Sequence, residues 1–290
     1  MIKHRVSRSA LAASCALAFT LLGPAPPCPA QEQRPAELYE THAIVDWKAR
    51  LLTIEVELTL AAAGLRLPEG RLSAERMIER DLPGLAKDAV LAIQADSYRS
   101  IEDAVADGSF DSQSLVALAS LAHFEGSSFS KDLRKFIASY SLRIDAIAAL
   151  FLSGASPSPI RAPLDSRPAR AYSGIVIYAK GSLPIHGEAV EGRAAPCLFP
   201  RVFDTEMNLV LDKSLVLPDI LAREGVLGYA SGLGVEAGGR VGADPLRVMA
   251  VELFGDRRTD YLISRDDALR ILSSPENRGL LRQGRVVVVY

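Results

Sequence analysis

The sequence predicts an α+β protein, in which an N-terminal module of a strand plus helices precedes a C-terminal module with a mixed β-sheet and helices on one side. Three patterns support this class. Leu52–Leu60, in the longer stretch Ile44–Leu60, alternates apolar and polar residues, which is typical of a half-buried strand. A pattern of helical spacing from Met77 to Ile93 follows it. Four consecutive valines, Val286–Val289, indicate a strand buried on both faces.

The composition is that of a globular protein of 290 residues, with 49% hydrophobic and 23% charged residues. A chain of this length has room for one large domain or two small ones. The composition excludes a disordered chain, a collagen and a small disulfide-stapled protein. The net charge of −2 gives no sign of the basic surface that binds nucleic acid, so we expect no nucleic-acid partner.

Residues 1–30 have the layout of a secretory signal peptide. Three basic residues in the first eight positions precede the uncharged apolar run Ser9–Gly23, and prolines follow this run. The run is shorter than the roughly 20 residues that a membrane span needs. We expect cleavage after Ala30 and export to the periplasm, and an uncleaved anchor is the alternative. Lipid attachment at Cys28 is not expected, because Pro27 stands where lipoprotein processing requires a small residue other than proline.

Cleavage after residue 30 would change the net charge from −2 to −5. It would also leave Cys197 as the single cysteine of the mature chain, so no disulfide could form within that chain. No later apolar run is long enough for a transmembrane span. Ser153–Ser173 contains four prolines and predicts a Pro/Ser-rich linker. This linker divides an N-terminal module, residues 31–152, from a C-terminal module, residues 174–290.

Local signals predict further elements in the N-terminal module. Ser73 is the expected N-cap of a helix that runs to about Ser97, and Pro83 either kinks this helix or starts a second one. Leu115–Phe124 also has a helical pattern. Leu133–Leu152 fits either a helix or a strand, and its periodicity does not decide between the two.

The C-terminal module is richer in strand signals. A helix is expected over Asp266–Leu272, where Ser264 and Asp267 form a capping pair. A second short helix begins at Ser274-Pro275, with proline at its first position. Strands are expected at Gly174–Ala179, Val226–Tyr229, Arg247–Phe254, Thr259–Ile263 and Arg285–Tyr290, and Pro200–Leu211 predicts a hairpin.

Cys197 and His186, with Glu188 between them in the sequence, come nearest to a catalytic set. A thiolate nucleophile needs a base and a group that orients the base, and these residue types are present. Their spacing matches no nucleophile motif, and the glycines and proline among them indicate a surface loop. We therefore expect a structural cysteine and a protein that is not an enzyme. An envelope hydrolase that uses the Cys197/His186 loop is the alternative.

No metal or cofactor site is expected. His42 and Asp46 are a candidate metal pair, but the histidines are scattered and neither HxxxH nor CxxC occurs. The glycines within Gly232–Gly242 lack the spacing of a phosphate-binding loop and indicate an inter-strand loop. The acids Asp256, Asp260, Asp266 and Asp267 do not fit a calcium loop and are expected in turns and helix caps. Trp47 is expected to anchor the first strand.

Three passages carry a resemblance to a known family. Tyr172–Gly181 combines a tyrosine, a glycine and an aliphatic strand, Pro196–Asp204 has a proline-rich hairpin pattern, and Pro245–Tyr290 ends on GRVVVVY. Weaker matches are Asp46-Trp47 and Ala95–Ser97. These passages resemble a family of secreted bacterial proteins that includes small outer-membrane lipoproteins and flagellar assembly proteins of the basal disk and periplasmic ring. The chain departs from that family in lacking a lipobox, and its linker and His186 loop look like insertions.

The resemblance implies a non-catalytic structural or assembly protein of the envelope or the flagellum, and it transfers no active-site residue. We expect such a protein to act in the periplasm, or in contact with the outer membrane, through contacts with other envelope or flagellar proteins or with itself. Exposed strand edges would suit such contacts. A carrier of a small envelope ligand, which would need a closed apolar cavity, is a further alternative.

Overall fold

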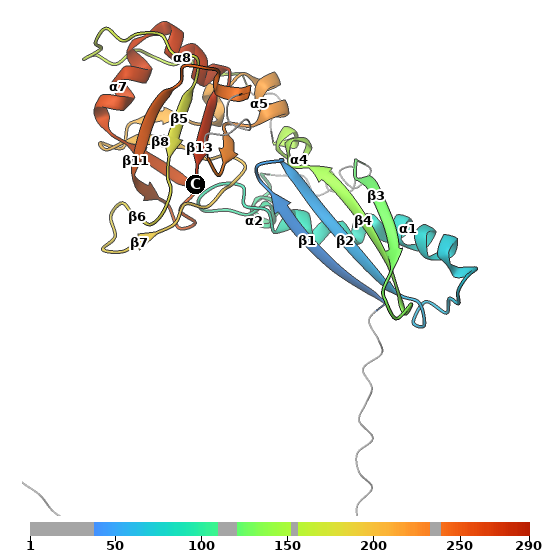
Figure 1. Ribbon diagram of the computed structural model, residues 1–290. Coiled ribbons are helices and arrows are strands. Elements are labelled where there is room, and N and C mark those ends of the chain that lie inside the picture. Colours follow the sequence, from blue (N-terminus) through green and yellow to red (C-terminus); the bar gives the residue numbers. More distant parts are fainter. Residues whose placement is uncertain (1–37, 110–120, 152–155, 233–238) are drawn as a thin grey trace, which may run out of the picture. The chain divides into compact units, whose positions relative to one another are not determined.

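The structure, a computed structural model, describes residues 38–109, 121–151, 156–232 and 239–290 (Figure 1). Within these residues the chain forms sheets of four and seven strands, a two-stranded ribbon and several helices, which confirms the α+β class. The expected signal peptide, residues 1–30, lies outside the described residues, so its cleavage stays a prediction. None of the described helices has the length and apolar character needed to cross a membrane.

The first sheet is antiparallel throughout, with the strand order β1-β2-β4-β3. The alternation predicted for Leu52–Leu60 is confirmed, because every second side chain from Leu52 to Leu60 is at most 5% exposed. The central strand β4 alternates in the same way, from Phe136 to Leu142. The strands are β1 (Tyr39–Asp46), β2 (Leu51–Thr59), β3 (His123–Phe129) and β4 (Lys135–Arg143).

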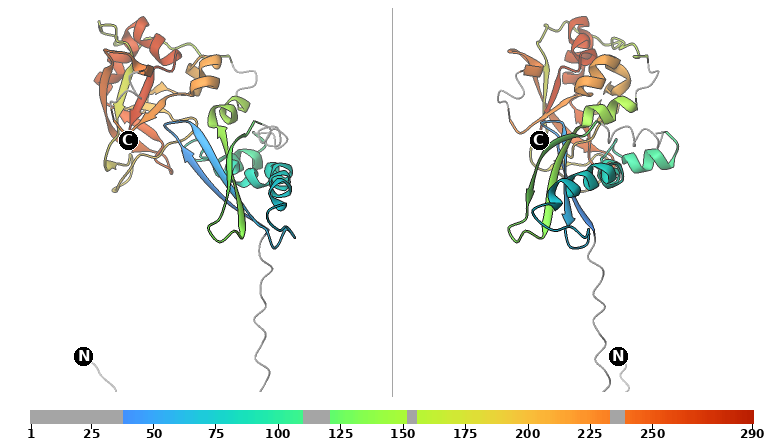
Figure 2. Two further views of the ribbon diagram at one scale, coloured as in Figure 1. Left: turned by 45° about the vertical axis from the view of Figure 1, so that its right-hand side comes forward. Right: turned by 90° about the vertical axis from the view of Figure 1, so that its right-hand side faces the viewer.

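Helix α1 (Gly70–Leu91) packs against β2 and β4 and covers one face of this sheet (Figure 2). Its buried residues recur at every fourth position, as in a helix with one apolar face. The prediction of Ser73 as the N-cap is wrong, because the helix begins one turn earlier. Gly70 is buried there, and a Cβ atom at this position would lie 3.2 Å from Leu65 Cβ. Pro83 lies inside α1, which continues past it.

Two stretches of the N-terminal part, one predicted as a helix and one left undecided, are partly strand. The helix predicted over Leu115–Phe124 falls partly outside the described residues, and its last two residues lie in β3, so the prediction is wrong there. Strand β4 supplies the backbone partners, with Phe124 opposite Tyr140. Leu133–Leu152 contains both β4 and a helix, which explains why no single period describes it. The helices besides α1 in this part are α2 (Ile101–Ala106) and α4 (Ile144–Leu150).

The second sheet is mixed, with the order β10-β13-β5-β11-β12-β8-β9. The pairs β11–β12 and β8–β9 are antiparallel, and the other neighbours are parallel. The buried valine strand is confirmed, because β13 lies between β10 and β5 and each of its four valines is at most 2% exposed. The strands are β5 (Ile175–Tyr178), β8 (Val202–Asp204), β9 (Leu209–Leu211), β10 (Gly228–Ala230), β11 (Leu246–Phe254), β12 (Asp260–Ile263) and β13 (Val286–Val289); β6 (Leu183–Pro184) and β7 (Glu191–Gly192) form the ribbon.

Three helices bury their apolar residues in the core that lines one face of this sheet, as predicted for helices on one side. On the opposite face of β5 and β13, Val176, Val287 and Val289 form a smaller buried cluster with Val241, and Tyr178 of β5 packs against it. Both predicted caps are confirmed, because Ser264 accepts a hydrogen bond from Asp267 N and Ser274 accepts one from Asn277 N. The helices are α5 (Pro218–Glu224), α7 (Arg265–Ser273) and α8 (Pro275–Arg282), and a 3₁₀ turn, η1, spans Lys213–Leu215.

The proline-rich connection is held against the second sheet's helices. Residues 156–173 contain neither helix nor strand. Arg167 N donates a hydrogen bond to Ser273 Oγ, and Tyr172 N donates one to Asn277 Oδ1. The segment is therefore a surface connection with fixed backbone contacts to α7 and α8.

Side chains of the first sheet also contact those of the second. Trp47, in the turn that follows β1, packs edge-to-face on Tyr229 of β10 with ring centroids 6.0 Å apart. Helix α4 packs against α5. The buried side chains of both sheets belong to one contiguous hydrophobic core. Trp47 therefore anchors the β1–β2 turn on the second sheet, a role that its sequence neighbours did not indicate.

Candidate functional site

The structure gives Cys197 and His186 separate partners. Cys197 is 2% exposed, and its backbone exchanges hydrogen bonds with the Tyr229 hydroxyl at 3.0 and 3.1 Å. Burial raises the pKa of the Cys197 thiol to about 12, so it is protonated at neutral pH. His186 Nδ1 lies 2.6 Å from Glu252 Oε2, so β11 supplies the carboxylate in place of Glu188. A thiolate attack by Cys197 with His186 as its base has no support in these positions.

The chain after α1 closes over the Cys197 region with its own polar groups. Ser97 Oγ lies 2.7 Å from Thr259 Oγ1 and 3.2 Å from the Phe254 carbonyl oxygen. The backbone amides of Leu198 and Phe199 donate hydrogen bonds to carbonyls of the same segment. These polar groups satisfy one another, as buried polar groups must.

The acidic residues near the C-terminus have structural roles, but one role differs from the prediction. Asp267 caps α7, and Asp266 lies in the first turn of that helix, as expected. Asp260, expected in a turn or cap, is fully buried, and Arg201 Nη2 lies 2.6 Å from its Oδ2 atom. Burial raises the pKa of the Asp260 carboxyl, and the Arg201 guanidinium opposes that rise. Asp260 therefore belongs to a buried ion pair that joins β12 to the start of β8.

The glycine-rich stretch Gly232–Gly242 lies partly outside the residues that the structure describes. Residues 233–238 are outside the described residues, so the prediction of an inter-strand loop stays untested over this part. Arg240, just after it, donates hydrogen bonds to the backbone carbonyls of Glu224, Gly225 and Gly284. Its guanidinium thus caps the C-terminal end of α5.

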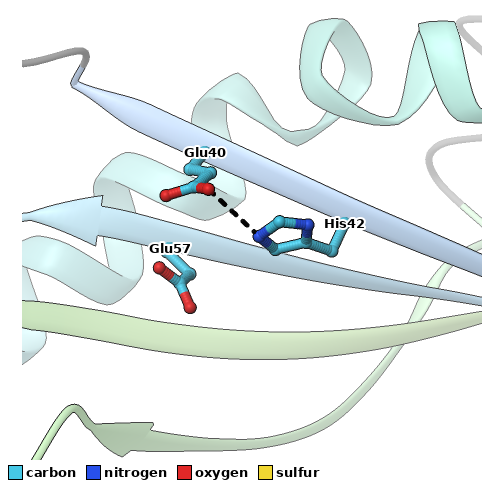
Figure 3. Close-up of side chains that lie close together, drawn as sticks. All are labelled: Glu40, His42 and Glu57. Atoms are coloured by element: carbon cyan, nitrogen blue, oxygen red, sulfur yellow. Dashed lines mark ion pairs between the residues drawn. The ribbon is translucent and has the colours of Figure 1, made fainter.

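The candidate functional site is the face of the first sheet that α1 does not cover. Glu40 and His42 on β1 and Glu57 on β2 lie close together there (Figure 3). Glu40 Oε1 is 3.3 Å from His42 Nε2. Lys135 on β4 reaches both carboxylates, with its Nζ atom 2.7 Å from Glu40 Oε2 and 2.5 Å from Glu57 Oε2. One cation thus links three neighbouring strands on this face.

The side-chain atoms of Glu40, His42 and Glu57 lie close enough to hold a metal ion, since their ligand atoms are all within 4.8 Å of one another. The Lys135 ammonium already supplies positive charge to both carboxylates, and a metal would have to displace it. Ion pairing therefore accounts for the cluster without a metal. Asp46, the sequence-derived partner of His42, instead accepts hydrogen bonds from the Lys48 and Ala49 amides in the turn after β1.

Strand β1 forms one edge of this face and is exposed over five successive residues, 40–44. Thr59 N donates a hydrogen bond to Leu38 O, so the hydrogen-bonded positions along β1 fall on even residue numbers. The backbone groups of Thr41 and Ala43 consequently point away from β2. Ile44 is 73% exposed beside them. Among the described residues no strand pairs with this edge, so β1 presents unpaired backbone donors and acceptors beside an apolar side chain.

Sequence reasoning missed Glu40, Glu57 and Lys135 as one group. A partial signal existed, because Glu57 alternates with the buried residues of β2 and had to face solvent. Neither the neighbouring strand nor its register could be read from that alternation.

Both halves of the chain match family models. Residues 39–150 match the model described as Treponema pallidum Tp0624, N-terminal domain, and residues 174–290 match Treponema pallidum Tp0624, second domain. The chain is similar to two consecutive domains of Tp0624. Both models represent a bacterial family of unknown function, and the matched domains follow in the same order here. No curated protein matches the chain. The matches support the bacterial part of the resemblance, and nothing in them confirms the likeness to lipoproteins or flagellar assembly proteins.

Proposed function

We propose that the protein is a non-catalytic structural or assembly protein of the bacterial cell envelope, associated with the flagellum or a comparable envelope structure, that acts through protein–protein contacts. In this proposal residues 1–30 direct export to the periplasm and are then removed. The observation that carries the proposal is the free edge of β1 beside the charged face of Glu40, Glu57 and Lys135.

A free strand edge recognises a partner by backbone hydrogen bonds, which add the partner's strand to the sheet. Thr41 and Ala43 offer such groups, and the paired charges next to them would set the orientation of the partner strand. Edge strands of proteins that stay monomeric are commonly shortened, covered or protected by inward-pointing charges. Strand β1 has eight residues, and residues 40–44 are all exposed.

The experiment replaces an outward-facing position of β1 by proline. Ala43→Pro removes a backbone N–H that makes no bond to β2 and places a ring on the edge. Ser127→Pro on β3 makes the equivalent change on the opposite edge of the same sheet and serves as the control. Thermal unfolding should confirm that both variants fold.

Each variant is then used to capture proteins from solubilised envelopes of the native bacterium, with mass spectrometry as the readout. Wild type and Ser127→Pro should retain the same partner, and Ala43→Pro should lose it. Equal capture by Ala43→Pro would exclude β1 as the contact. Cell fractionation tests the periplasmic location, and N-terminal sequencing tests the cleavage site. We expect a mature chain that begins at Gln31, and a mature chain that begins with a lipidated Cys28 would contradict cleavage after Ala30.

A further inference from the structure

A second feature, independent of the β1 edge, is a cavity of about 290 Å³ between the segment after α1 and the start of the second sheet. Its lining consists of Asp96, Tyr98 and Arg99 on one side and of Phe199, Arg201, Asp212 and Lys213 on the other. We propose that this cavity binds a small organic anion. Its carboxylate or phosphate group accepts hydrogen bonds from Lys213 and Arg201, and its flat apolar part packs on Tyr98.

Lys213 supplies one positive charge to the cavity. Its Nζ atom lies 4.7 Å from the centroid of the Phe199 ring, a distance typical of a cation–π contact. Within the part of the chain that the structure describes, no acidic side chain lies within ion-pair distance of it. Its N–H groups therefore remain available to an incoming anion.

Arg201 offers a second donor in a fixed orientation. Its Nε and Nη2 atoms donate to Asp260 Oδ2 at 2.9 and 2.6 Å, which holds the guanidinium plane in place. The guanidinium carbon lies 5.7 Å from the Tyr98 ring centroid and 5.3 Å from that of Phe203. Nη1 has no hydrogen-bond partner among the described residues. A guanidinium oriented in this way loses little entropy when it binds an anion.

The acidic residues of the lining are already engaged, which favours an anion over a cation. Asp96 accepts hydrogen bonds from the backbone amides of Tyr98 and Arg99 and from the Arg99 guanidinium. Asp212 Oδ1 accepts two hydrogen bonds from Ser214. The hydrogen-bonding groups of the lining that remain without a partner are therefore mainly the N–H donors of positively charged side chains.

The shape of the cavity limits the size of the ligand. A volume near 290 Å³ is at the lower end of the range for small-molecule sites, so one small molecule fits and a polymer does not. Tyr98 is 48% exposed, which leaves ring surface free for stacking. The two sides of the cavity come from segments far apart in the sequence, namely the segment after α1 and the residues around β8 and β9. A ligand that binds both sides would therefore also stabilise the contact between these two segments.

The test uses the purified chain with benzoate and phenyl phosphate as anionic probes, and benzamide as a neutral probe of similar shape. Binding is measured by calorimetry and by thermal unfolding. At ten times its dissociation constant, an anionic probe should raise the Tm by about 3–6 °C, and benzamide should bind at least tenfold more weakly.

The matched variants are Lys213→Met, which removes the free charge from an exposed side chain, and Lys180→Met, an exposed lysine outside the cavity lining. Lys213→Met should weaken benzoate binding about tenfold, and Lys180→Met should leave it unchanged. Equal affinity for benzoate and benzamide, an unchanged affinity in Lys213→Met, or no binding of either anion at about 10 mM would each overturn the proposal.

Discussion

Replacement of Arg50 by alanine should lower the free energy of unfolding by about 2–4 kcal/mol. Arg50 lies in the turn between β1 and β2, and its Nε atom is 2.5 Å from Asp145 Oδ1 on α4. The side chains are 12% and 5% exposed, so water screens this ion pair little. The guanidinium also packs on Gly225, where a Cβ atom would lie 2.3 Å from Arg50 Nη2.

The magnitude follows from two opposing contributions. Loss of one partner from a buried ion pair costs about 3–5 kcal/mol, because Asp145 keeps its charge with fewer partners. The Nη2 atom of Arg50 is buried without a hydrogen-bond partner, and its removal returns about 1 kcal/mol or more. A net loss of about 2–4 kcal/mol corresponds to a fall in Tm of about 4–16 °C for a chain of this length.

Urea unfolding of a double-mutant cycle measures the effect. Arg50→Ala, Asp145→Ala and the double variant should give a coupling energy above about 1 kcal/mol. Arg143→Ala is the internal control, because Arg143 also pairs with Asp145 but is 60% exposed, and it should cost less than about 1 kcal/mol. Equal losses from Arg50→Ala and Arg143→Ala, or a coupling energy near zero, would refute the assignment of the stabilisation to the buried pair.

Three further predictions concern single positions. Val288 is fully buried on β13, so Val288→Ala should cost about 1–3 kcal/mol in urea unfolding, and no measurable loss would place the strand outside the core. Cys197, 2% exposed with a thiol pKa of about 12, should react with a thiol reagent only after denaturation, and rapid labelling of the native chain would contradict its burial. Hydrogen bonds from Arg80 and Tyr39 lower the pKa of Asp81 to about 2. The ionised Asp81 carboxylate should therefore contribute fully to stability above about pH 4, and this contribution should disappear as the pH falls through 2. In acid unfolding, the Tyr39→Phe variant should lose less free energy of unfolding than the wild type over that pH range.

The sequence pattern alone predicted burial and helix starts correctly where these depend on a residue's nearest neighbours in the sequence. The alternation of β2 and the four valines of β13 predicted which side chains are buried, because a strand places successive residues on opposite faces. Ser264 and Ser274 predicted two helix starts, since a cap bonds to an amide three residues away. The start of α1 was mispredicted, because the fit of Gly70 against Leu65 outweighed the capping preference of Ser73.

The candidate site and the buried ion pairs required the tertiary structure. Lys135 meets Glu40 only because β1, β2 and β4 lie side by side in one register, although the two residues are 95 positions apart. The same separation divides Arg50 from Asp145. His186 pairs with Glu252 and not with the nearby Glu188 because β11 passes beside its loop. Periodicity and caps report the local path of the backbone, and they carry no information on which distant segments the packed core brings within hydrogen-bonding distance.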